Sequence, residues 1–177
     1  VIEETGYQPS SQAQMLRTKK TKLVGVILPK IDSNTISREV AGISDILTKK
    51  GYQLILANTN NNIEEELKYL SLFKDNQVDG VIFIATILTK QHRDMLKEYK
   101  VPIVLLGQRL EGYPCIFQDD QKAAMTLTEQ MVKTGSKFGY ITVTDKDEAV
   151  GRKRMSGVEE ILSKNKIEFG SEYVKCG

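Results

Sequence analysis

Residues 8–31, QPSSQAQMLRTKKTKLVGVILPKI, contain the segment around which the rest of the chain is organised. The first half of this segment is small, polar and basic, and the second half becomes the apolar run Leu23–Leu28, which ends at Pro29. The run is short and rich in β-branched residues without polar alternation, which is typical of a strand buried on both faces of a parallel sheet. A basic segment joined directly to a buried strand indicates an arm that contacts a polyanion and a domain that controls it.

The distribution of charge supports this interpretation. The net charge is +2, yet residues 1–31 hold five basic and two acidic residues, a net +3, whereas residues 32–177 hold 20 basic and 21 acidic residues, a net −1. A basic arm on a nearly neutral body favours phosphate contact by the arm alone. On charge alone, a solvated basic linker is equally compatible with the pattern.

Composition limits the class of protein. The chain has 177 residues, of which 40% are hydrophobic and 27% charged, as in a soluble globular protein with one core or two linked lobes. No apolar run approaches the ~20 residues that cross a bilayer, and residues 1–8 do not resemble a signal peptide. We therefore expect a cytoplasmic protein with no membrane partner. Cys115 and Cys176 lie far apart, which favours idle thiols over a disulfide or a metal site.

Strand and helix patterns alternate along the chain. Apolar runs predict strands, and apolar residues three or four positions apart predict the helices between them. The expected strands are 23–28, 52–57, 78–85, 101–106, 115–118 and 138–143, with a further one beginning at 172–176, and the expected helices are 34–50, 62–76, 89–99, 121–134 and 152–164. This order predicts an α/β fold with a doubly wound parallel sheet, whose ligands bind beyond the carboxyl ends of the strands.

Several polar residues have predicted local roles. Asp32, Ser33 and Asn34 offer caps for the first helix, Asn62 and Glu65 resemble a capping box, and Asp119 or Asp120 caps a later helix. Thr89 is expected to cap the helix that contains His92, the only histidine, which the charged sequence around it predicts to face solvent. The segment 138–143 is expected to be a buried strand, and 144–150 an acidic loop.

Signals of enzymatic chemistry are weak. The chain contains no G-x-S-x-G, H-E-x-x-H or Walker A motif, and its first strand–helix turn, Pro29 to Ser33, is not glycine-rich. We therefore predict neither a cofactor nor a metal. Binding is better supported, because planar polar groups that suit sugar hydroxyls follow the strands: Asn34, Arg38, Asn58, Arg109 and Asp119. For any single one of them, a helix cap or a solvent-facing side chain is the stronger alternative.

A resemblance to a known family rests on residues 1–9 (VIEETGYQP), Ala13, residues 16–21 (LRTKKT) and residues 24–27 (VGVI). They resemble the hinge region of transcription regulators of the LacI/GalR type, the lactose-repressor family, and the similarity continues to the last residue. The family has an N-terminal helix-turn-helix head, a hinge helix and a periplasmic-binding-protein-like, two-lobed effector domain. The resemblance implies that residues 1–21 are the end of the DNA-binding head and the hinge helix, 22–118 the first lobe, and 119–177 the start of an incomplete second lobe.

The same resemblance implies DNA contacts in the arm. Residues 10–16 are too short to form a stable isolated helix, so they are expected to become ordered on operator DNA. Leu16 would wedge between base pairs in the minor groove and Ala13 would face the groove, with Arg17, Lys19 and Lys20 as further DNA contacts. The alternative for Leu16 is packing on the domain below. The helix-turn-helix itself is expected to be missing from this chain.

The resemblance also implies an effector site in a cleft between the lobes. The candidates are Ile36, Ser37, Arg38, Asn58, Arg109, the crossover acid Asp119, and Arg154 in an R-x-x-G motif that ends at Gly157. The chain departs from the family at Gly107-Gln108, where many members have Asp-Arg. The elements SRE, QDD and GRKR look most like the disaccharide-responsive branch, of trehalose or sucrose type.

Together these residues predict a repressor, not an enzyme, that binds operator DNA and a small sugar or sugar phosphate. A homodimer is expected, because the helices 34–50 and 62–76 carry surplus apolar residues such as Ile46 and Leu72. The alternative is a sugar-binding protein of a transport system with the same fold, and an enzyme of the doubly wound class is a distant third.

Overall fold

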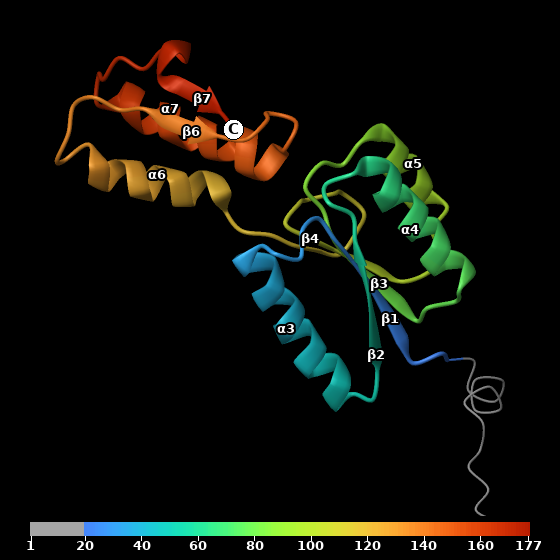
Figure 1. The fold of residues 1–177 in the computed structure, drawn as a ribbon. Helices are drawn as coiled ribbons and strands as arrows, with labels where there is room; N and C mark the ends of the chain where they lie inside the picture. Colours follow the sequence, from blue (N-terminus) through green and yellow to red (C-terminus); the bar gives the residue numbers. More distant parts are fainter. Residues whose placement is uncertain (1–19) are drawn as a thin grey trace, which may run out of the picture. The chain divides into compact units, whose positions relative to one another are not determined.

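The computed structural model describes residues 20–177, which form an α/β fold with a parallel sheet (Figure 1). The predicted helix at 10–16 and the predicted DNA contacts Ala13, Leu16, Arg17 and Lys19 lie outside the described residues. Within the described part, no helix is both long and apolar enough to cross a membrane. The described chain divides into two compact units, residues 20–82 with Glu98–Ile103 and Phe83–Lys97 with Val104–Gly177.

The main sheet has five strands in the order β2-β1-β3-β4-β5, and its recorded pairings are parallel. Because β1 lies between β2 and β3, the strand order reverses next to β1, as in a doubly wound sheet. The predicted α/β class is therefore confirmed. β1 has the predicted bounds, and the other four strands begin or end a residue or two away from the expected positions. Their bounds are Leu23–Leu28, Gln53–Asn58, Gly80–Ile84, Ile103–Leu106 and Cys115–Ile116 for β1 to β5.

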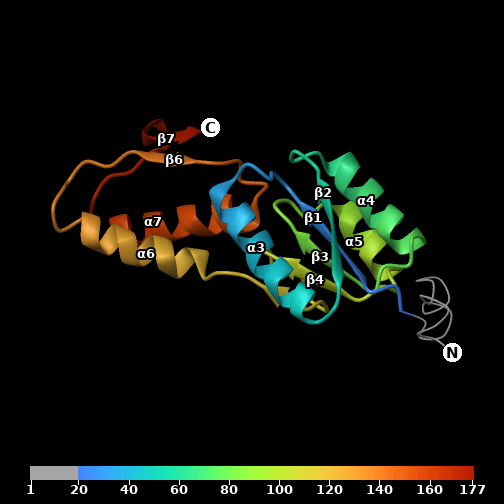
Figure 2. The same cartoon turned by 60° about the horizontal axis from the view of Figure 1, so that its bottom comes forward.

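The first unit packs two helices on opposite faces of β1 and β2, α3 (Asn34–Lys49) and α4 (Ile63–Asp75) (Figures 1 and 2). Its core includes Ile27 and Leu28 of β1 and Leu70 of α4, none of which is exposed. A Cβ on Gly25 would lie 2.4 Å from the Phe73 ring, so only glycine lets α4 approach β1 this closely.

The helix starts in this unit only partly follow the predictions. Asn62 caps α4, because its side chain accepts hydrogen bonds from the backbone N–H groups of Glu64 and Glu65. In a capping box the Asn62 N–H would donate to the Glu65 side chain. Here the Asn62 N–H donates to the Thr59 carbonyl instead. The side-chain cap predicted for α3 is wrong: Ser33 stands at the N-cap without a side-chain bond, and the Ser37 hydroxyl donates back to its carbonyl at 2.7 Å.

The second unit contains α5 (Lys90–Lys97), α6 (Asp120–Met131) and α7 (Arg154–Lys164). A π-helix, η1 (Glu148–Lys153), leads directly into α7 in place of part of the predicted loop. The strands β6 (Tyr140–Thr142) and β7 (Val174–Cys176) pair in parallel, and a 3-10 turn, η2 (Ser171–Tyr173), precedes β7. Helices α6 and α7 lie side by side along the same side of β6 (Figures 1 and 2).

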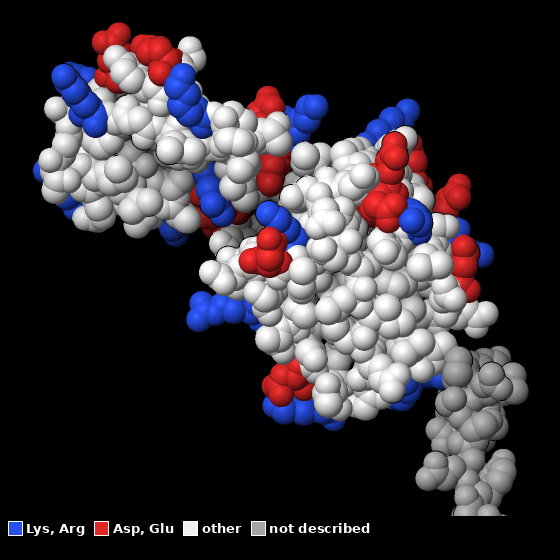
Figure 3. Space-filling model, in the orientation of Figure 1, with Lys and Arg blue, Asp and Glu red and all other residues white. Residues whose placement is uncertain are grey.

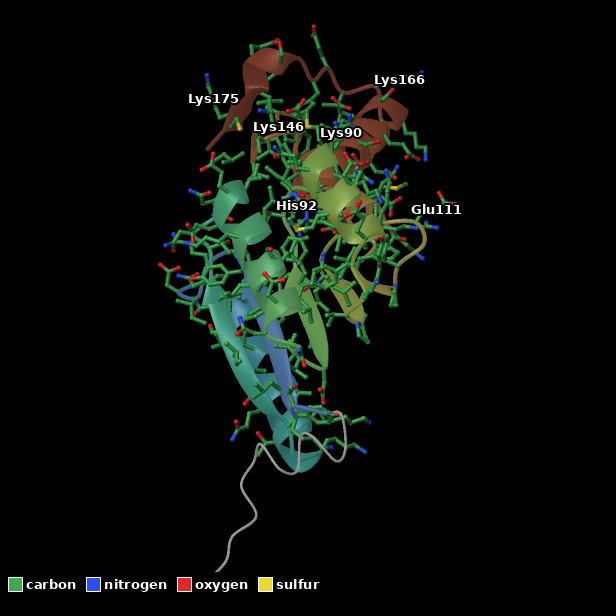
Figure 4. All side chains as sticks on the ribbon, turned by 90° about the vertical axis from the view of Figure 1, so that its right-hand side faces the viewer. Lys90, His92, Glu111, Lys146, Lys166 and Lys175 are labelled. Atoms are coloured by element: carbon green, nitrogen blue, oxygen red, sulfur yellow. The ribbon has the colours of Figure 1, made fainter. Side chains whose placement is uncertain are left out.

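Two predicted environments in this unit are wrong. His92 is not solvent-facing: it is fully buried and its ring centroid lies 5.6 Å from that of Phe83 (Figure 4). The predicted Thr89 cap is confirmed, since the Thr89 hydroxyl accepts from the His92 N–H at 3.3 Å and also lies 2.9 Å from His92 Nδ1.

The second wrong prediction is the buried strand at 138–143. Only Tyr140–Thr142 is extended, and Ile141 is 82% exposed in the described chain.

Candidate functional site

Asn58 stands at the carboxyl end of β2, opposite Leu28 at the end of β1. Its Oδ1 accepts a hydrogen bond from the Ile31 N–H at 3.2 Å, and its Nδ2 donates to Asn60 Oδ1 at 3.0 Å. The side chain therefore holds the loop after β1 against the loop after β2. It remains exposed, so it can also offer its remaining hydrogen-bonding capacity to a ligand.

Three other predicted residues of the first unit lie at the start of α3. Ile36 is half-buried, whereas Ser37 and Arg38 are exposed. The Ser37 hydroxyl donates within its own helix, whereas Arg38 is an exposed residue of the first turns of α3, the helix that follows β1. The parallel register therefore brings α3 and Asn58 to one edge of the sheet, where ligands of doubly wound folds bind.

Arg109 belongs to a cavity of about 370 Å³ in the second unit, within the size range of small-molecule sites. Its guanidinium lies 6.0 Å from the centre of the Phe117 ring, a cation–π contact. Gly107 and Gln108, which follow β4 and were expected near a pocket for that reason, also line it. The sequence predictions omitted the rest of the lining, which mixes both signs of charge with an aromatic ring: Glu111, Phe117, Gln118, Glu148, Ala149 and Lys153.

A buried polar network supports this cavity. Gln108 donates through Nε2 to the Thr86 carbonyl and to Asp147 Oδ1, both at 2.8 Å. The same carboxylate oxygen caps η1 by accepting from the N–H groups of Ala149 and Val150. Gln108 and Asp147 are only 5% and 8% exposed. Because buried polar groups need partners, this network fixes the start of η1, whose residues line the cavity.

Arg154 makes an ion pair with Asp120 rather than with Asp119. Arg154 Nε donates to Asp120 Oδ1 at 2.6 Å, and the Asp120 side chain is 6% exposed against 43% for Arg154. Asp119 is exposed and serves as the N-cap of α6, accepting from the Lys122 N–H at 3.1 Å. Fixing a planar guanidinium through Nε leaves its outer edge directed away from Asp120 and available to a ligand.

Arg154 and Asp120 lie at one end of a second cavity of about 390 Å³. Apolar side chains of α6, α7 and β6 form most of the lining: Leu127, Met131, Ile141, Val158 and Leu162 are among them. Arg109 does not line this second cavity. The structure therefore brings the predicted residues to three places: the strand ends of β1 and β2 with the start of α3, the Arg109 cavity, and the Arg154–Asp120 pair. Asp119 lines neither cavity.

The glycine of the R-x-x-G motif, Gly157, has a packing role in addition to the role of Arg154. A Cβ on Gly157 would lie 2.4 Å from the Gln121 carbonyl and 3.1 Å from the Ala124 Cβ, both on α6. Glycine therefore permits α6 and α7 to approach closely. One turn earlier, the same approach carries Arg154 to Asp120.

The parallel sheet, with polar side chains beyond its strand ends, defines an α/β domain of the class that binds ligands at the carboxyl ends of its strands. Residues 21–175 match the profile of periplasmic binding proteins and the sugar binding domain of the LacI family, and the chain belongs to that family.

Similar proteins include repressors. The sucrose operon repressor of Staphylococcus xylosus is 31% identical over 169 residues, which cover 95% of this chain and 53% of the relative. Catabolite control protein A of Priestia megaterium is 33% identical over 180 residues, covering 99% of this chain and 54% of the relative. The chain thus spans about half the length of these curated relatives.

Solved structures share the fold. The crystal structure of the transcription regulator CcpA of Lactococcus lactis superposes with a TM-score of 0.79 at 35% identity, over 88% of this chain and 58% of that one. The trehalose repressor of Escherichia coli gives a TM-score of 0.72 at 20% identity, over 82% of this chain and 57% of that one. The second comparison supports the fold alone.

Proposed function

We propose that the protein is a sugar-responsive, DNA-binding transcription regulator, and specifically a repressor. The family membership carries this proposal, supported by relatives that are a sucrose operon repressor and catabolite control proteins. The basic arm, a net +3 over residues 1–31, suits contact with DNA phosphates. In this proposal the protein is cytoplasmic and is not an enzyme.

The proposed organisation assigns residues 1–21 to the end of the DNA-binding head and the hinge, 22–118 to the first lobe and 119–177 to the second. A small sugar or sugar phosphate is the proposed effector, and the sucrose operon repressor among the similar proteins favours a disaccharide. The proposed contacts are Ile36, Ser37, Arg38, Asn58, Arg109, Asp119 and Arg154. The structure adds Asp120 as the residue that orients Arg154.

The test uses the full-length protein and a DNA duplex that it selects from a random library. Its affinity for that duplex is measured by fluorescence anisotropy with and without sucrose, trehalose and their 6-phosphates. We expect one of these sugars to weaken DNA binding, because an effector shifts the equilibrium towards the state that it binds better. Selection of no duplex, or an affinity that no sugar alters, contradicts the proposal.

A sugar-binding protein of a transport system is the second candidate, because the matching profile also covers periplasmic binding proteins. It predicts tight sugar binding by calorimetry together with no selected duplex. The basic residues at 17–22 favour the regulator, since a transport protein has no phosphate backbone to contact.

We expect Leu16→Ala to weaken binding to the selected duplex strongly and to leave sugar affinity unchanged. A leucine wedged between base pairs stabilises a bent duplex, and alanine is too short to replace it. Replacing Lys19 and Lys20 by alanine provides the matched comparison: it should weaken binding to all DNA and flatten its salt dependence. Unaltered affinity of Leu16→Ala for the selected duplex would refute the wedge.

We also expect the full-length protein to be a homodimer with two-fold symmetry. Apolar side chains of three neighbouring elements are exposed in the described chain: Ile46 on α3, Ile55 and Leu56 on β2, and Leu72 on α4. Figure 3 shows that charged side chains lie around the rim of this face and leave its middle uncharged. Such a face suits the apolar core of a dimer interface.

The measurement for the dimer is sedimentation equilibrium at micromolar concentration. Ile46→Asp should shift the protein to monomers, because a carboxylate in an apolar interface loses its hydration without gaining a partner. Thr48→Asp adds the same charge at an exposed polar position of α3 and should leave the mass unchanged. A monomeric wild type, or a dimeric Ile46→Asp variant, contradicts this interface.

A further inference from the structure

Asp79 makes a set of contacts that the sequence did not predict. It directly precedes β3, and its N–H donates to the Leu23 carbonyl at the start of β1, at 2.8 Å. Its side chain does not merely shape a turn: Oδ1 accepts from the Thr21 N–H at 2.8 Å, and Oδ2 accepts from the Lys22 N–H at 3.1 Å. The Thr21 hydroxyl also lies 2.9 Å from Oδ1. One carboxylate thus holds two consecutive residues of the segment that enters β1.

Thr21 and Lys22 also make contacts with residues other than Asp79. The Thr21 hydroxyl lies 3.1 Å from the Gln77 carbonyl, and the Lys22 carbonyl accepts from the Gln53 N–H at 2.8 Å. The Lys22 ammonium lies 4.4 Å from the centre of the Tyr52 ring. Lys22 has a φ of 58°, a left-handed conformation that is uncommon for a lysine. The surrounding contacts therefore impose a specific backbone conformation where the basic arm joins the domain.

Electrostatics supports the same interpretation. Burial alone would raise the pKa of Asp79, but the hydrogen bonds from Thr21 and Lys22 and the nearby charge of Lys20 outweigh it and lower the pKa below its usual value. The ionised form is therefore the one that the Thr21–Lys22 backbone binds. Hydrogen bonds to an ionised acceptor are stronger than those between neutral groups.

We infer that Asp79 is a positioning residue, which clamps Thr21 and Lys22 and so sets the position and direction from which the arm reaches DNA. This inference rests on the proposed function. An arm that becomes ordered on DNA pays an entropic cost for each residue that it fixes. Because the clamp orders Thr21 and Lys22 in advance, these two residues add nothing to that cost. Releasing the clamp adds two residues to be ordered at each binding event.

The first readout is independent of DNA. In Asp79→Asn, an amide NH₂ replaces one acceptor and faces a backbone donor, so the two amides cannot both be satisfied. We expect the Thr21 and Lys22 amides to exchange about tenfold faster or more by NMR hydrogen exchange, while the β1 amides stay protected. Asp75→Asn is the matched control, since it makes the same change at an exposed position near the end of α4. Unchanged exchange at both amides overturns the clamp.

The second readout is affinity of the full-length protein for the duplex that the wild type selects. We expect Asp79→Asn to bind about thirtyfold to a thousandfold more weakly, as follows from ordering two more residues at about 1–2 kcal/mol each, with sugar affinity and Tm close to those of the wild type. Thr21→Val removes only the hydroxyl contacts, keeps both backbone donors and should fall between the wild type and Asp79→Asn. The Thr21→Val variant therefore still tests the clamp if Asp79→Asn folds poorly.

The outcomes separate the clamp from the proposed function. Faster exchange with undiminished DNA affinity overturns the positioning role, because the clamp then serves only the start of β3. If the wild type selects no duplex, the proposed function fails and the role in DNA binding fails with it, even where the exchange data establish the clamp. The inference is supported if Asp79→Asn shows both faster exchange at Thr21 and Lys22 and weaker DNA binding, and Asp75→Asn shows neither.

Discussion

Arg154→Ala is expected to abolish the response to sugar while DNA binding persists, giving a repressor that cannot be induced. The Arg154 guanidinium is fixed through Nε by the buried Asp120 carboxylate at 2.6 Å, which leaves its outer edge for paired hydrogen bonds to sugar hydroxyls. Truncation removes those bonds and also leaves a buried carboxylate without its cation. A hydrogen bond to a charged group contributes about 1.5–3 kcal/mol, so sugar affinity should fall about tenfold or more.

Titration calorimetry measures this loss with the sugar that weakens DNA binding of the wild type. Arg152→Ala is the matched control, because it removes the same charge two residues earlier, where Arg152 pairs with Glu148 at 3.1 Å and its side chain is 63% exposed. That exposed pair should contribute little, and sugar affinity should stay at the wild-type value. Equal sugar affinity of Arg154→Ala and the wild type would exclude Arg154 as a ligand contact.

Gly157→Val is expected to have the largest effect on stability, lowering the free energy of unfolding by about 3 kcal/mol or more. A Cβ at this position would lie 2.4 Å from the Gln121 carbonyl and 3.2 Å from the Met125 N. Both are backbone atoms of α6, so the overlap cannot be relieved by turning a side chain and requires α6 and α7 to move apart. The move should also lengthen the contact between Arg154 and Asp120 and weaken sugar binding.

Thermal unfolding followed by circular dichroism measures the change in Tm. Gly42→Ala is the control, because Gly42 also lies in a helix, α3, but has nothing within 4 Å of its Cβ position. Alanine there should stabilise the protein by up to about 1 kcal/mol through helix propensity. A Gly157→Val protein with a Tm equal to that of the wild type contradicts the close approach of α6 and α7.

Local sequence determined most of the secondary structure. The apolar run at β1 and the alternation of strands and helices predicted the α/β sheet, since burial on one or two faces imposes a period that a short window reveals. The Asn62 and Asp119 caps were predictable for the same reason, because a cap bonds to N–H groups two or three residues away. Such interactions need no knowledge of which distant segment lies nearby.

The site depended on partners far apart in sequence. His92 lies in a charged helix, yet its burial depends on the Phe83 ring, which belongs to a different element. Two adjacent aspartates could each have paired with Arg154, and only the packing of α6 on α7 selects Asp120. The contacts of Asp79 depend on the fold, which brings Thr21, 58 residues away, to its carboxylate. Periodicity reports how a segment is buried, whereas the identity of a long-range partner depends on tertiary packing, and here only the structure decided it.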